Sequence, residues 1–355
     1  MNKKILFWIS SDLTHFGLSK HFHEEHNFEL YAIYDVTNNL KKYFEKQQIV
    51  KFKKVWYMHD HIQKNKQIVD LNYLKSIEKK YGINLLSLAF NERHFYRYND
   101  YYTFTEDEVL KIIEQECKLF EKILDDIKPD FVFMLAPNFH YHQIFGVMCK
   151  NRNIKTSMLG FSRFGKRAIL SSGFDKIDSM PDEVNSSGIE RTPNELLDYL
   201  KGDDYYDDNI NFSSNFMSSK SLMLKALFRY LTSSYENSNL YTYYGRTKLK
   251  SLLITTFVNL REKYREFFIN KNLEQKISDD SHFLYFPLQL TQENGLLLAA
   301  PFHTNQLEVI RNICQSLPVG YKLYVKAHPV MFMRGWRPSS FYKKIMDLPN
   351  VKLFH

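Results

Sequence analysis

The stretch TEDEVLKIIEQECKLFEKILDDIKPDFVFMLAP, residues 105–137, decides the fold class. Thr105 is a helix-capping residue type, acidic residues crowd the first turn, and apolar residues then recur at helical spacing as far as Ile127. The apolar stripe consists of Val109, Ile112, Ile113, Cys117, Phe120 and Leu124. Phe131–Ala136 is apolar without alternation, which is typical of a strand buried on both faces of a parallel sheet. A long amphipathic helix that leads into such a strand predicts an α/β fold.

The same alternation of strands and helices runs through the first half of the chain. The pattern predicts strands at Ile5–Ile9, Phe28–Tyr34, Ile49–Met58, Leu85–Phe90 and Lys155–Leu159. It predicts helices at Leu13–Glu25, Val69–Tyr81 and His142–Asn151. Residues 1–170 are therefore expected to form a doubly wound, Rossmann-like domain.

The pattern changes twice in the second half of the chain. Residues 171–280 begin with polar, turn-rich stretches and continue with two amphipathic helices, so they are expected to form a helical linker region. From residue 281 the alternation resumes, with strands in residues 282–289, 321–329 and 350–355 and helices at Asn305–Ser316 and Ser339–Met346. Residues 281–355 are expected to be the first half of a second Rossmann-like domain.

Composition restricts the class of protein. Of the 355 residues, 44% are hydrophobic and 16% aromatic, which argues against disorder over most of the length. No apolar run reaches the ~18 residues of a membrane-spanning helix, and the first one is too short for a signal peptide. The three cysteines, Cys117, Cys149 and Cys314, lie far apart and are typical of core thiols in a reducing compartment. A cytoplasmic location is predicted.

The positive charge is concentrated in one region. The net charge is +8, and residues 211–276 hold 11 lysines and arginines but 4 aspartates and glutamates. This favours an anionic partner, with an anionic membrane surface at the amphipathic helices as the sharper interpretation. A solvated helical face, with the apolar stripes packed on a domain, is the alternative. Nucleic acid is not expected, because no recognition motif accompanies the charge.

Three stretches carry a family resemblance: KILFWISSDLTHFGLSKHF from Lys4, ELYAIYDVTNNLKKYFEKQQIVKFKKVWYMHDHI from Glu29, and everything from Tyr285 to His355. They resemble the capsule and surface polysaccharide biosynthesis proteins, which are GT-B-like glycosyltransferases. The resemblance covers Asn2–Leu170 loosely and Phe283–His355 closely. It implies an acceptor on the N-terminal domain, a donor nucleotide on the C-terminal one, and a C-terminal part that continues beyond His355.

The resemblance also suggests a donor. Transferases that use CMP-activated acidic sugars carry a His-Pro motif after a strand, and its histidine contacts the CMP phosphate. His328 and Pro329 match that motif, so a CMP-sugar is the expected donor and His328 a catalytic residue. Lys326 lies two residues upstream, on the same side of the strand, and is expected to bind the donor. A turn histidine and a solvent-facing lysine are the alternatives.

Other donor-side candidates follow the same logic. Gln292 and Glu293 follow the domain's first strand, where a Rossmann-like domain faces its ligand. Arg337, beside Trp336, either covers the donor or belongs to a rigid loop that enters the next helix. The acid-Asp-Gly triplet that often supplies the base in these transferases is not in this sequence, so the base is sought in the N-terminal domain.

Polar residues after the N-terminal strands supply the acceptor side. Asp12 follows the first strand and is either the catalytic base or a helix cap. Glu92 is a second candidate for the base. The residues expected to bind the acceptor are His15, Arg93, His142 and Arg163. His59–His61, the sequence HDH, contains metal-ligand residue types, but their spacing without a fourth ligand predicts no metal site.

The sequence therefore predicts a glycosyltransferase of capsular or surface polysaccharide biosynthesis, which moves an acidic, CMP-activated sugar to a growing glycan or glycolipid. Alternatives within enzymes are a UDP-sugar transferase and a CDP-glycerol-type polymer phosphotransferase. The alternative outside enzymes is a scaffold or glycan-binding module. No tightly bound cofactor is expected. If the chain is truncated at His355, we expect it to bind nucleotide weakly and to be inactive alone.

Overall fold

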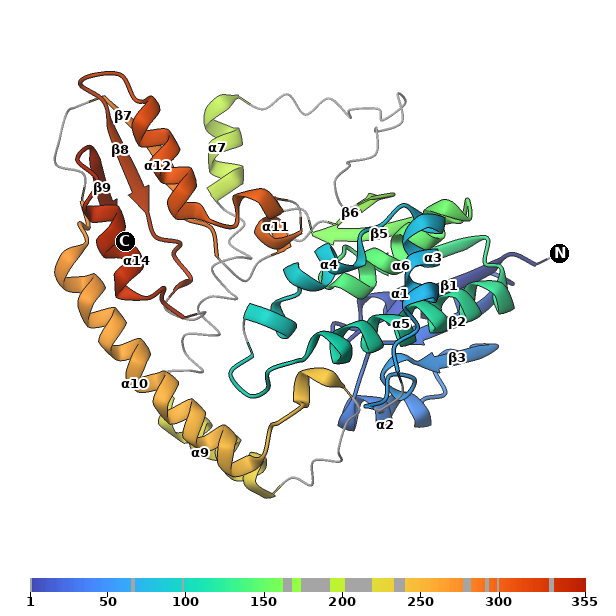
Figure 1. The fold of residues 1–355 in the computed structure, drawn as a ribbon. Helices are drawn as coiled ribbons and strands as arrows, with labels where there is room; N and C mark the ends of the chain where they lie inside the picture. Colours follow the sequence, from blue (N-terminus) through green and yellow to red (C-terminus); the bar gives the residue numbers. More distant parts are fainter. Residues whose placement is uncertain are drawn as a thin grey trace. The chain divides into compact units, whose positions relative to one another are not determined.

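The structure, a computed structural model, describes residues 2–64, 68–97, 99–161, 168–173, 192–201, 219–232, 240–276, 282–290, 294–298, 300–331 and 335–355 (Figure 1). The chain divides into two compact units. The first comprises Met1–Tyr96 and Tyr102–Tyr244, and the second Arg97–Tyr101 and Gly245–His355.

The first unit is built on a six-stranded sheet. Its strands are β1 (Lys4–Ile9), β2 (Glu29–Tyr34), β3 (Lys54–Tyr57), β4 (Phe131–Leu135), β5 (Lys155–Phe161) and β6 (Ala168–Ser171). The strand order is β3-β2-β1-β4-β5-β6, and all neighbours are parallel except β5 and β6. The chain winds outward from β1 in one direction and then returns to β1's other side with β4, which creates a switch point between these two strands. The predicted doubly wound α/β class is confirmed.

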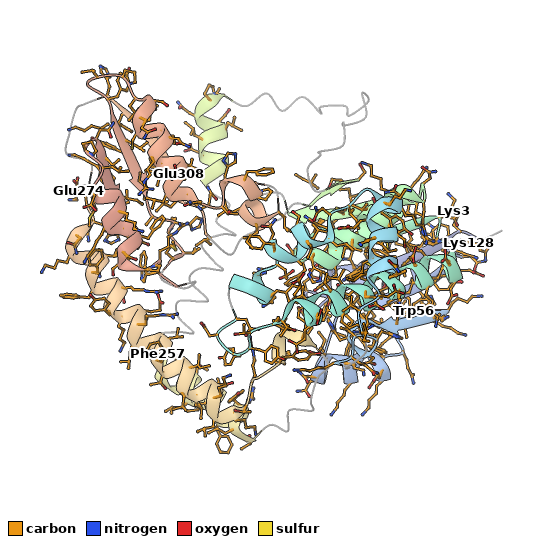
Figure 2. The ribbon with its side chains drawn as sticks, in the orientation of Figure 1. Lys3, Trp56, Lys128, Phe257, Glu274 and Glu308 are labelled. Atoms are coloured by element: carbon orange, nitrogen blue, oxygen red, sulfur yellow. The ribbon has the colours of Figure 1, made fainter. Side chains whose placement is uncertain are left out.

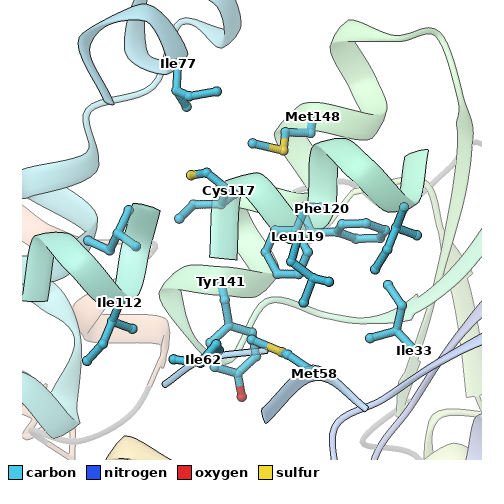
Figure 3. Packing of buried hydrophobic residues seen from close by; sticks show 14 of the residues in the cluster. Ile33, Met58, Ile62, Ile77, Ile112, Cys117, Leu119, Phe120, Tyr141 and Met148 are labelled. Atoms are coloured by element: carbon cyan, nitrogen blue, oxygen red, sulfur yellow. The ribbon is translucent and has the colours of Figure 1, made fainter. Parts of the chain in front are cut away.

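Helices cover both faces of this sheet (Figure 1). Residues alternate along β1, so Phe7 packs into a cluster with α1 (Thr14–Glu25) and α2 (Asn38–Lys46). Trp8 packs into the larger cluster on the opposite face. The helices that contribute to that cluster are α3 (Leu71–Tyr81), α4 (Leu85–Asn91), α5 (Glu106–Ile127) and α6 (His140–Asn151). Figure 3 shows the close packing of its aliphatic, aromatic and sulfur-containing side chains.

Helix α5 confirms the prediction made from the decisive stretch. Thr105 accepts a hydrogen bond from the Glu108 N–H, and the Glu108 carboxylate reaches back to the Thr105 N–H, which forms a capping box. The helix buries its apolar stripe, and Phe120 lies in ring contact with both Trp8 and Phe145. The helix therefore connects the sheet to α6.

The structure corrects one predicted element and shortens another. Leu85–Phe90 was predicted as a strand but forms α4, because Asn84 caps a helix there by accepting a hydrogen bond from the Ser87 N–H. A short apolar run fits a buried helix as well as a strand, so periodicity alone does not separate the two. Strand β3 is confirmed only at its end, from Lys54.

The second unit contains a three-stranded parallel sheet in the order β7-β8-β9. Its strands are β7 (Phe283–Pro287), β8 (Lys322–Lys326) and β9 (Val351–Phe354). Its longer helices are α10 (Lys248–Asn272), α12 (Gln306–Ser316) and α14 (Ser339–Met346), all of which contribute to one buried cluster. The basic amphipathic helix α10 thus belongs to a compact unit, whereas the sequence placed it in a linker. The other predicted helix of that region is α9 (Lys220–Thr232), and α7 (Pro193–Lys201) precedes it.

Removing a core side chain from α5 is expected to destabilise the first unit. Leu124 is 1% exposed, so Leu124→Ala leaves a cavity and should lower the unfolding free energy by about 2–5 kcal/mol. The matched control is Leu86→Ala, since Leu86 is 52% exposed and should cost less than about 1 kcal/mol. Denaturant unfolding followed by circular dichroism measures both. Equal losses would contradict the packing described for α5.

Candidate active site

A cavity of about 360 Å³ opens at the carboxyl ends of the parallel strands of the first unit. It lies at the switch point between β1 and β4, where open α/β sheets bind their ligands. The residues that line it at or just after the strand ends are Ser10, Ser11 and Asp12 after β1, Asp35 after β2, His59 after β3, and Leu135, Asn138 and Phe139 at and after the end of β4. The wall is completed by His94, Tyr141, His142, Leu240, Tyr241 and Thr242.

Asp35 is the electrostatic centre of this cavity. Its Oδ1 atom lies 2.7 Å from His59 Nε2, and its Oδ2 atom accepts hydrogen bonds from the Tyr141 hydroxyl at 3.0 Å and from the Trp8 indole N–H at 3.4 Å. His142 Nε2 lies 3.6 Å from Oδ2. Burial alone would raise the pKa of Asp35. The hydrogen bonds and charges of His142 and His59 outweigh burial and hold this pKa well below its usual range. The carboxylate is therefore ionised.

The hydrogen bonds determine which ring nitrogens of the two histidines carry protons. His59 Nε2 faces the ionised Asp35 carboxylate and must donate to it. His142 Nδ1 accepts a hydrogen bond from the Asn138 N–H at 3.2 Å, which leaves the proton on Nε2, toward Asp35. In the neutral form of His59 the lone pair is consequently on Nδ1, and this buried atom has no hydrogen-bond partner among the described residues.

Aromatic rings form one side of the cavity. Phe139 stacks on Tyr141 with 5.1 Å between ring centroids, and Tyr141 stacks on Trp8. The partly exposed His94 ring, stacked on Phe139, adds a further flat surface. Aromatic faces beside short hydroxyl and amide side chains can bind a flat, weakly polar ring with several hydroxyl groups.

A second buried charged cluster lies next to this cavity. His140 Nδ1 lies 2.9 Å from Glu92 Oε2, and His140 Nε2 lies 2.7 Å from Glu116 Oε2. Burial would lower the pKa of His140, but the charge of Glu116 and hydrogen bonds to both carboxylates raise it to about 10. Burial would raise the pKa of Glu92, yet its hydrogen bonds from His140 lower it. Burial raises the pKa of Glu116. Glu92, His140 and Glu116 therefore tie α4, α5 and α6 together.

The acceptor-side candidates from the sequence divide between the cavity and the core. Asp12 and His142 line the cavity, and Asp12 Oδ1 also accepts a hydrogen bond from the Thr14 N–H at the start of α1. Glu92 is 3% exposed and bonded to His140, so it does not line the cavity. Its predicted role as the base stays a prediction that this burial disfavours.

His15 and Arg93 are close to the cavity but do not line it. His15 is fully buried on α1, and burial lowers its pKa. Arg93 donates to the Asn138 carbonyl at 3.0 Å and lies over the Phe139 ring, so it helps to position two residues that line the cavity. Arg163 lies outside the described residues.

The donor-side candidates lie at the carboxyl edge of the second sheet. Lys326 ends β8 and is exposed. His328 follows it, and its Nδ1 atom accepts a hydrogen bond from the Val330 N–H at 3.3 Å, which leaves Nε2 to carry the proton when the ring is neutral. Arg337 is 7% exposed, donates to the Gln289 carbonyl at 2.6 Å and lies over a phenylalanine ring.

These contacts give Arg337 a part in holding its loop, and its contact with a donor stays a prediction. Gln292 and Glu293 lie outside the described residues.

Within the part of the chain that the structure describes, no group of three or more His, Cys, Asp or Glu side chains is arranged to hold a metal ion.

Sequence reasoning missed Asp35 and the pairing of His140 with Glu116. Asp35 directly follows β2, so the strand-end rule that selected Asp12 could have selected it. Glu116 interrupts the apolar face of α5, three residues after Ile113, which is also a readable signal. His59 was considered together with His61, but its partner is Asp35.

The chain was compared with known proteins. No family model and no curated protein matches it. Among solved structures it is similar over its whole length to UDP-GlcNAc 2-epimerase from Methanocaldococcus jannaschii, with 11% identity, 73% of that chain covered and a TM-score of 0.24. It is similar to UDP-GlcNAc 2-epimerase from Neisseria meningitidis bound to UDP-GlcNAc, with 12% identity, 72% of that chain covered and a TM-score of 0.25.

The buried histidine cluster predicts a specific pH dependence of stability. The pKa of His140 rises from 6.5 to about 10 on folding, so its stabilising contribution is complete below pH 6.5 and is lost as pH rises toward 10. Relative to a variant in which Glu92, Glu116 and His140 are all glutamine, the wild-type protein should lose up to about 1.4 kcal/mol per pH unit in this window. Urea unfolding from pH 6 to 9 measures both proteins. Parallel curves would contradict an imidazolium at His140.

Proposed function

We propose that this protein is a glycosyltransferase of capsular or surface polysaccharide biosynthesis. A nucleotide-sugar donor binds at the carboxyl edge of the second unit's sheet, and the acceptor glycan binds in the cavity of the first unit. The observation that carries the proposal is that cavity, at a switch point, with polar side chains from four successive parallel strands converging on it.

The donor side supplies a group for the leaving phosphate. Transfer breaks the bond between the anomeric carbon and a phosphate oxygen, and negative charge develops on that oxygen. The turn bond to Val330 gives His328 a defined orientation, with Nε2–H as a donor for such an oxygen. Exposed Lys326, two residues earlier, can add positive charge. The resemblance makes a CMP-activated acidic sugar the first donor to test.

The acceptor side suits a sugar residue at the end of a glycan. Phe139 is partly exposed and offers a ring face on which a pyranose can stack. Ser10, Ser11, Asn138 and Thr242 are short polar side chains that can bond its hydroxyl groups.

Helix α10 adds a membrane-facing element to the proposal. Six large apolar residues recur along it at helical spacing and are 64–69% exposed. They are Leu249, Leu253, Phe257, Leu260, Tyr264 and Phe267.

The helix also holds 6 lysines and arginines and 2 glutamates, a composition typical of helices that lie on anionic membranes. Among the described residues, no helix is both long and apolar enough to cross a membrane. Figure 2 shows Phe257 projecting from this helix. We propose that the transferase works at the inner face of the plasma membrane.

A donor panel with a histidine variant tests the transferase. The complete protein, with any residues that follow His355, and a glycan acceptor are incubated with CMP-, UDP- and CDP-activated donors, and turnover is expected with CMP-sialic acid or CMP-Kdo. His328→Asn keeps an acceptor for the Val330 N–H but removes the imidazole, so turnover should fall by about 10²–10³-fold at an unchanged unfolding midpoint. The control is His303→Asn, since His303 is exposed in the same unit.

Each result of the panel has a clear meaning. Turnover of a UDP-sugar alone would show that the donor is a UDP-sugar and not a CMP-sugar. Turnover of CDP-glycerol would show that the enzyme is a phosphotransferase and not a glycosyltransferase. Equal activity of His328→Asn and the wild-type protein would show that His328 has a structural role in its turn and no catalytic role. Glycan binding without turnover of any donor would favour a binding module.

Vesicle binding tests the membrane element. The protein should sediment with phosphatidylglycerol vesicles more than with phosphatidylcholine vesicles, and salt should weaken the binding. Phe257→Glu places a charge in the apolar stripe and should lower binding about tenfold or more. Asn259→Glu makes the same charge change at an exposed position outside the stripe and should have a small effect. Equal effects of the two variants would contradict insertion of the stripe.

A further inference from the structure

The cavity of the first unit carries negative charge. Asp35 lines it as an ionised carboxylate, and its side chain is 11% exposed. Asp12 also lines the cavity and is exposed, and an exposed aspartate is negatively charged at neutral pH. Among the described residues that line the cavity, none is a lysine or an arginine. A ligand in this cavity therefore lies in the field of two carboxylates.

A carboxylate of the protein already occupies the start of α1. In open α/β sheets, the N–H groups at a helix start that follows a strand are a ready site for phosphate or carboxylate groups of ligands. Here the N–H of Thr14, the first residue of α1, donates to Asp12 Oδ1 at 3.0 Å. Asp12 thus takes the place that an anionic ligand would need.

Uncharged groups form much of the accessible polar surface of the cavity. Ser11 is exposed, and Ser10, Asn138 and Thr242 are partly exposed. Hydroxyl and amide groups both donate and accept hydrogen bonds, which matches the hydroxyl groups of a sugar. A sugar carboxylate would instead lose hydration beside two charges of its own sign, and such an arrangement is unfavourable.

We propose that the cavity selects an uncharged sugar residue as the acceptor and excludes sugar residues that carry a carboxylate. This inference rests on the proposed transferase activity and deepens it, because it names the class of acceptor. Asp12 is the specificity-determining residue. Its carboxylate is exposed, and only one of its two oxygens is used by the turn into α1.

The second unit has the opposite charge at its sheet edge. Lys326 is exposed at the end of β8, and the guanidinium of Arg337 bonds to the loop that follows β7. An anionic nucleotide-sugar is attracted to such an edge and repelled by the cavity of the first unit. The charge of each unit by itself therefore separates the donor from the acceptor.

This selectivity limits each acceptor to one addition of an acidic sugar. Transfer joins an acceptor oxygen to the anomeric carbon of the donor and breaks the bond from that carbon to the phosphate oxygen. The nucleotide leaves with the electron pair, and the hydroxyl proton passes through a base to water. The product now ends in an acidic sugar, which the cavity excludes. A transferase that adds an uncharged sugar must therefore supply the acceptor.

Matched pairs of sugars test the selectivity without a donor. Methyl β-glucoside and methyl β-glucuronide differ only at C6, which is a hydroxymethyl group in one and a carboxylate in the other, and methyl β-galactoside and methyl β-galacturonide form a second pair. His59, His94 and His142 also line the cavity, so NMR titration of the protein is run at about pH 8, where ordinary imidazoles are neutral. The acidic member of the bound pair should have a Kd at least about tenfold higher. High salt should reduce this difference.

Two variants test the role of Asp12. Asp12→Asn keeps an oxygen for the Thr14 N–H and removes the charge. It should lower the Kd of the acidic sugar at least about threefold and change the Kd of the uncharged sugar less than about twofold. The control is Asp107→Asn, since Asp107 is exposed on α5 and does not line the cavity. The control should match the wild-type protein for both sugars.

The outcomes separate this inference from the function on which it rests. Equal Kd values within each pair would overturn the selectivity and leave the transferase intact. Equal effects of Asp12→Asn and Asp107→Asn would overturn the role of Asp12. Binding of neither uncharged sugar would overturn the inference together with the acceptor role of the cavity. Selective binding of an uncharged sugar without turnover of any donor would support the inference and remove the transferase.

Product analysis tests the single addition. The complete protein is given a CMP-activated acidic sugar and a glycan that ends in an uncharged sugar. Mass spectrometry should show one acidic residue added to each acceptor molecule, even with excess donor. A ladder of successive acidic residues would overturn the inference, because it would require a product end that carries a carboxylate to enter the cavity.

Discussion

The ionised carboxylate of Asp35 is the constraint on which the candidate site depends. A buried charge costs several kcal/mol unless donors surround it. Here the donors come from β1 through Trp8, from the end of β3 through His59, and from the start of α6 through Tyr141. Satisfying one charge therefore fixes the mutual positions of three segments. The same side chains line the cavity or support its wall, so its shape follows from an electrostatic requirement.

The first turn of α6 serves two charged clusters at once. His140 turns into the core, where Glu92 and Glu116 occupy both of its ring nitrogens. The next two residues, Tyr141 and His142, face Asp35 instead. Because adjacent helical residues point in directions about 100° apart, this division is a geometric consequence of placing a helix start between a core and a cavity. The ion pairs of His140 with Glu92 and Glu116 fix the first turn of α6. That turn in turn positions Tyr141 and His142, which line the cavity.

The sequence predicted most of the fold because hydrophobic periodicity is a local signal. Glu106–Ile127 and Phe131–Leu135 follow directly from it. Leu85–Phe90 failed because a run this short carries no period, and the decision came from the cap at Asn84. The site was only partly predictable. The rule that polar residues follow strand ends selected Asp12, and the apolar stripe predicted that α5 packs in the core. The pairing of Asp35 with His59 was missed because these residues lie 24 positions apart. Only the order of the strands in the sheet brings them together, and residue spacing does not encode that order.

The two histidines at the sheet edges have opposite polarity. His328 commits Nδ1 as an acceptor to the Val330 N–H, so its neutral ring presents Nε2–H as a donor. His59 donates Nε2–H to Asp35, so in its neutral ring the lone pair is on Nδ1, which is buried. Glycosyl transfer needs a hydrogen-bond donor for the leaving phosphate oxygen, which is the role proposed for His328. Each histidine obtains its polarity from a contact within its own unit, with backbone in one case and a buried carboxylate in the other. The role proposed for His328 therefore requires no change of tautomer when a nucleotide binds, because one hydrogen bond from the backbone already determines which ring nitrogen carries the proton.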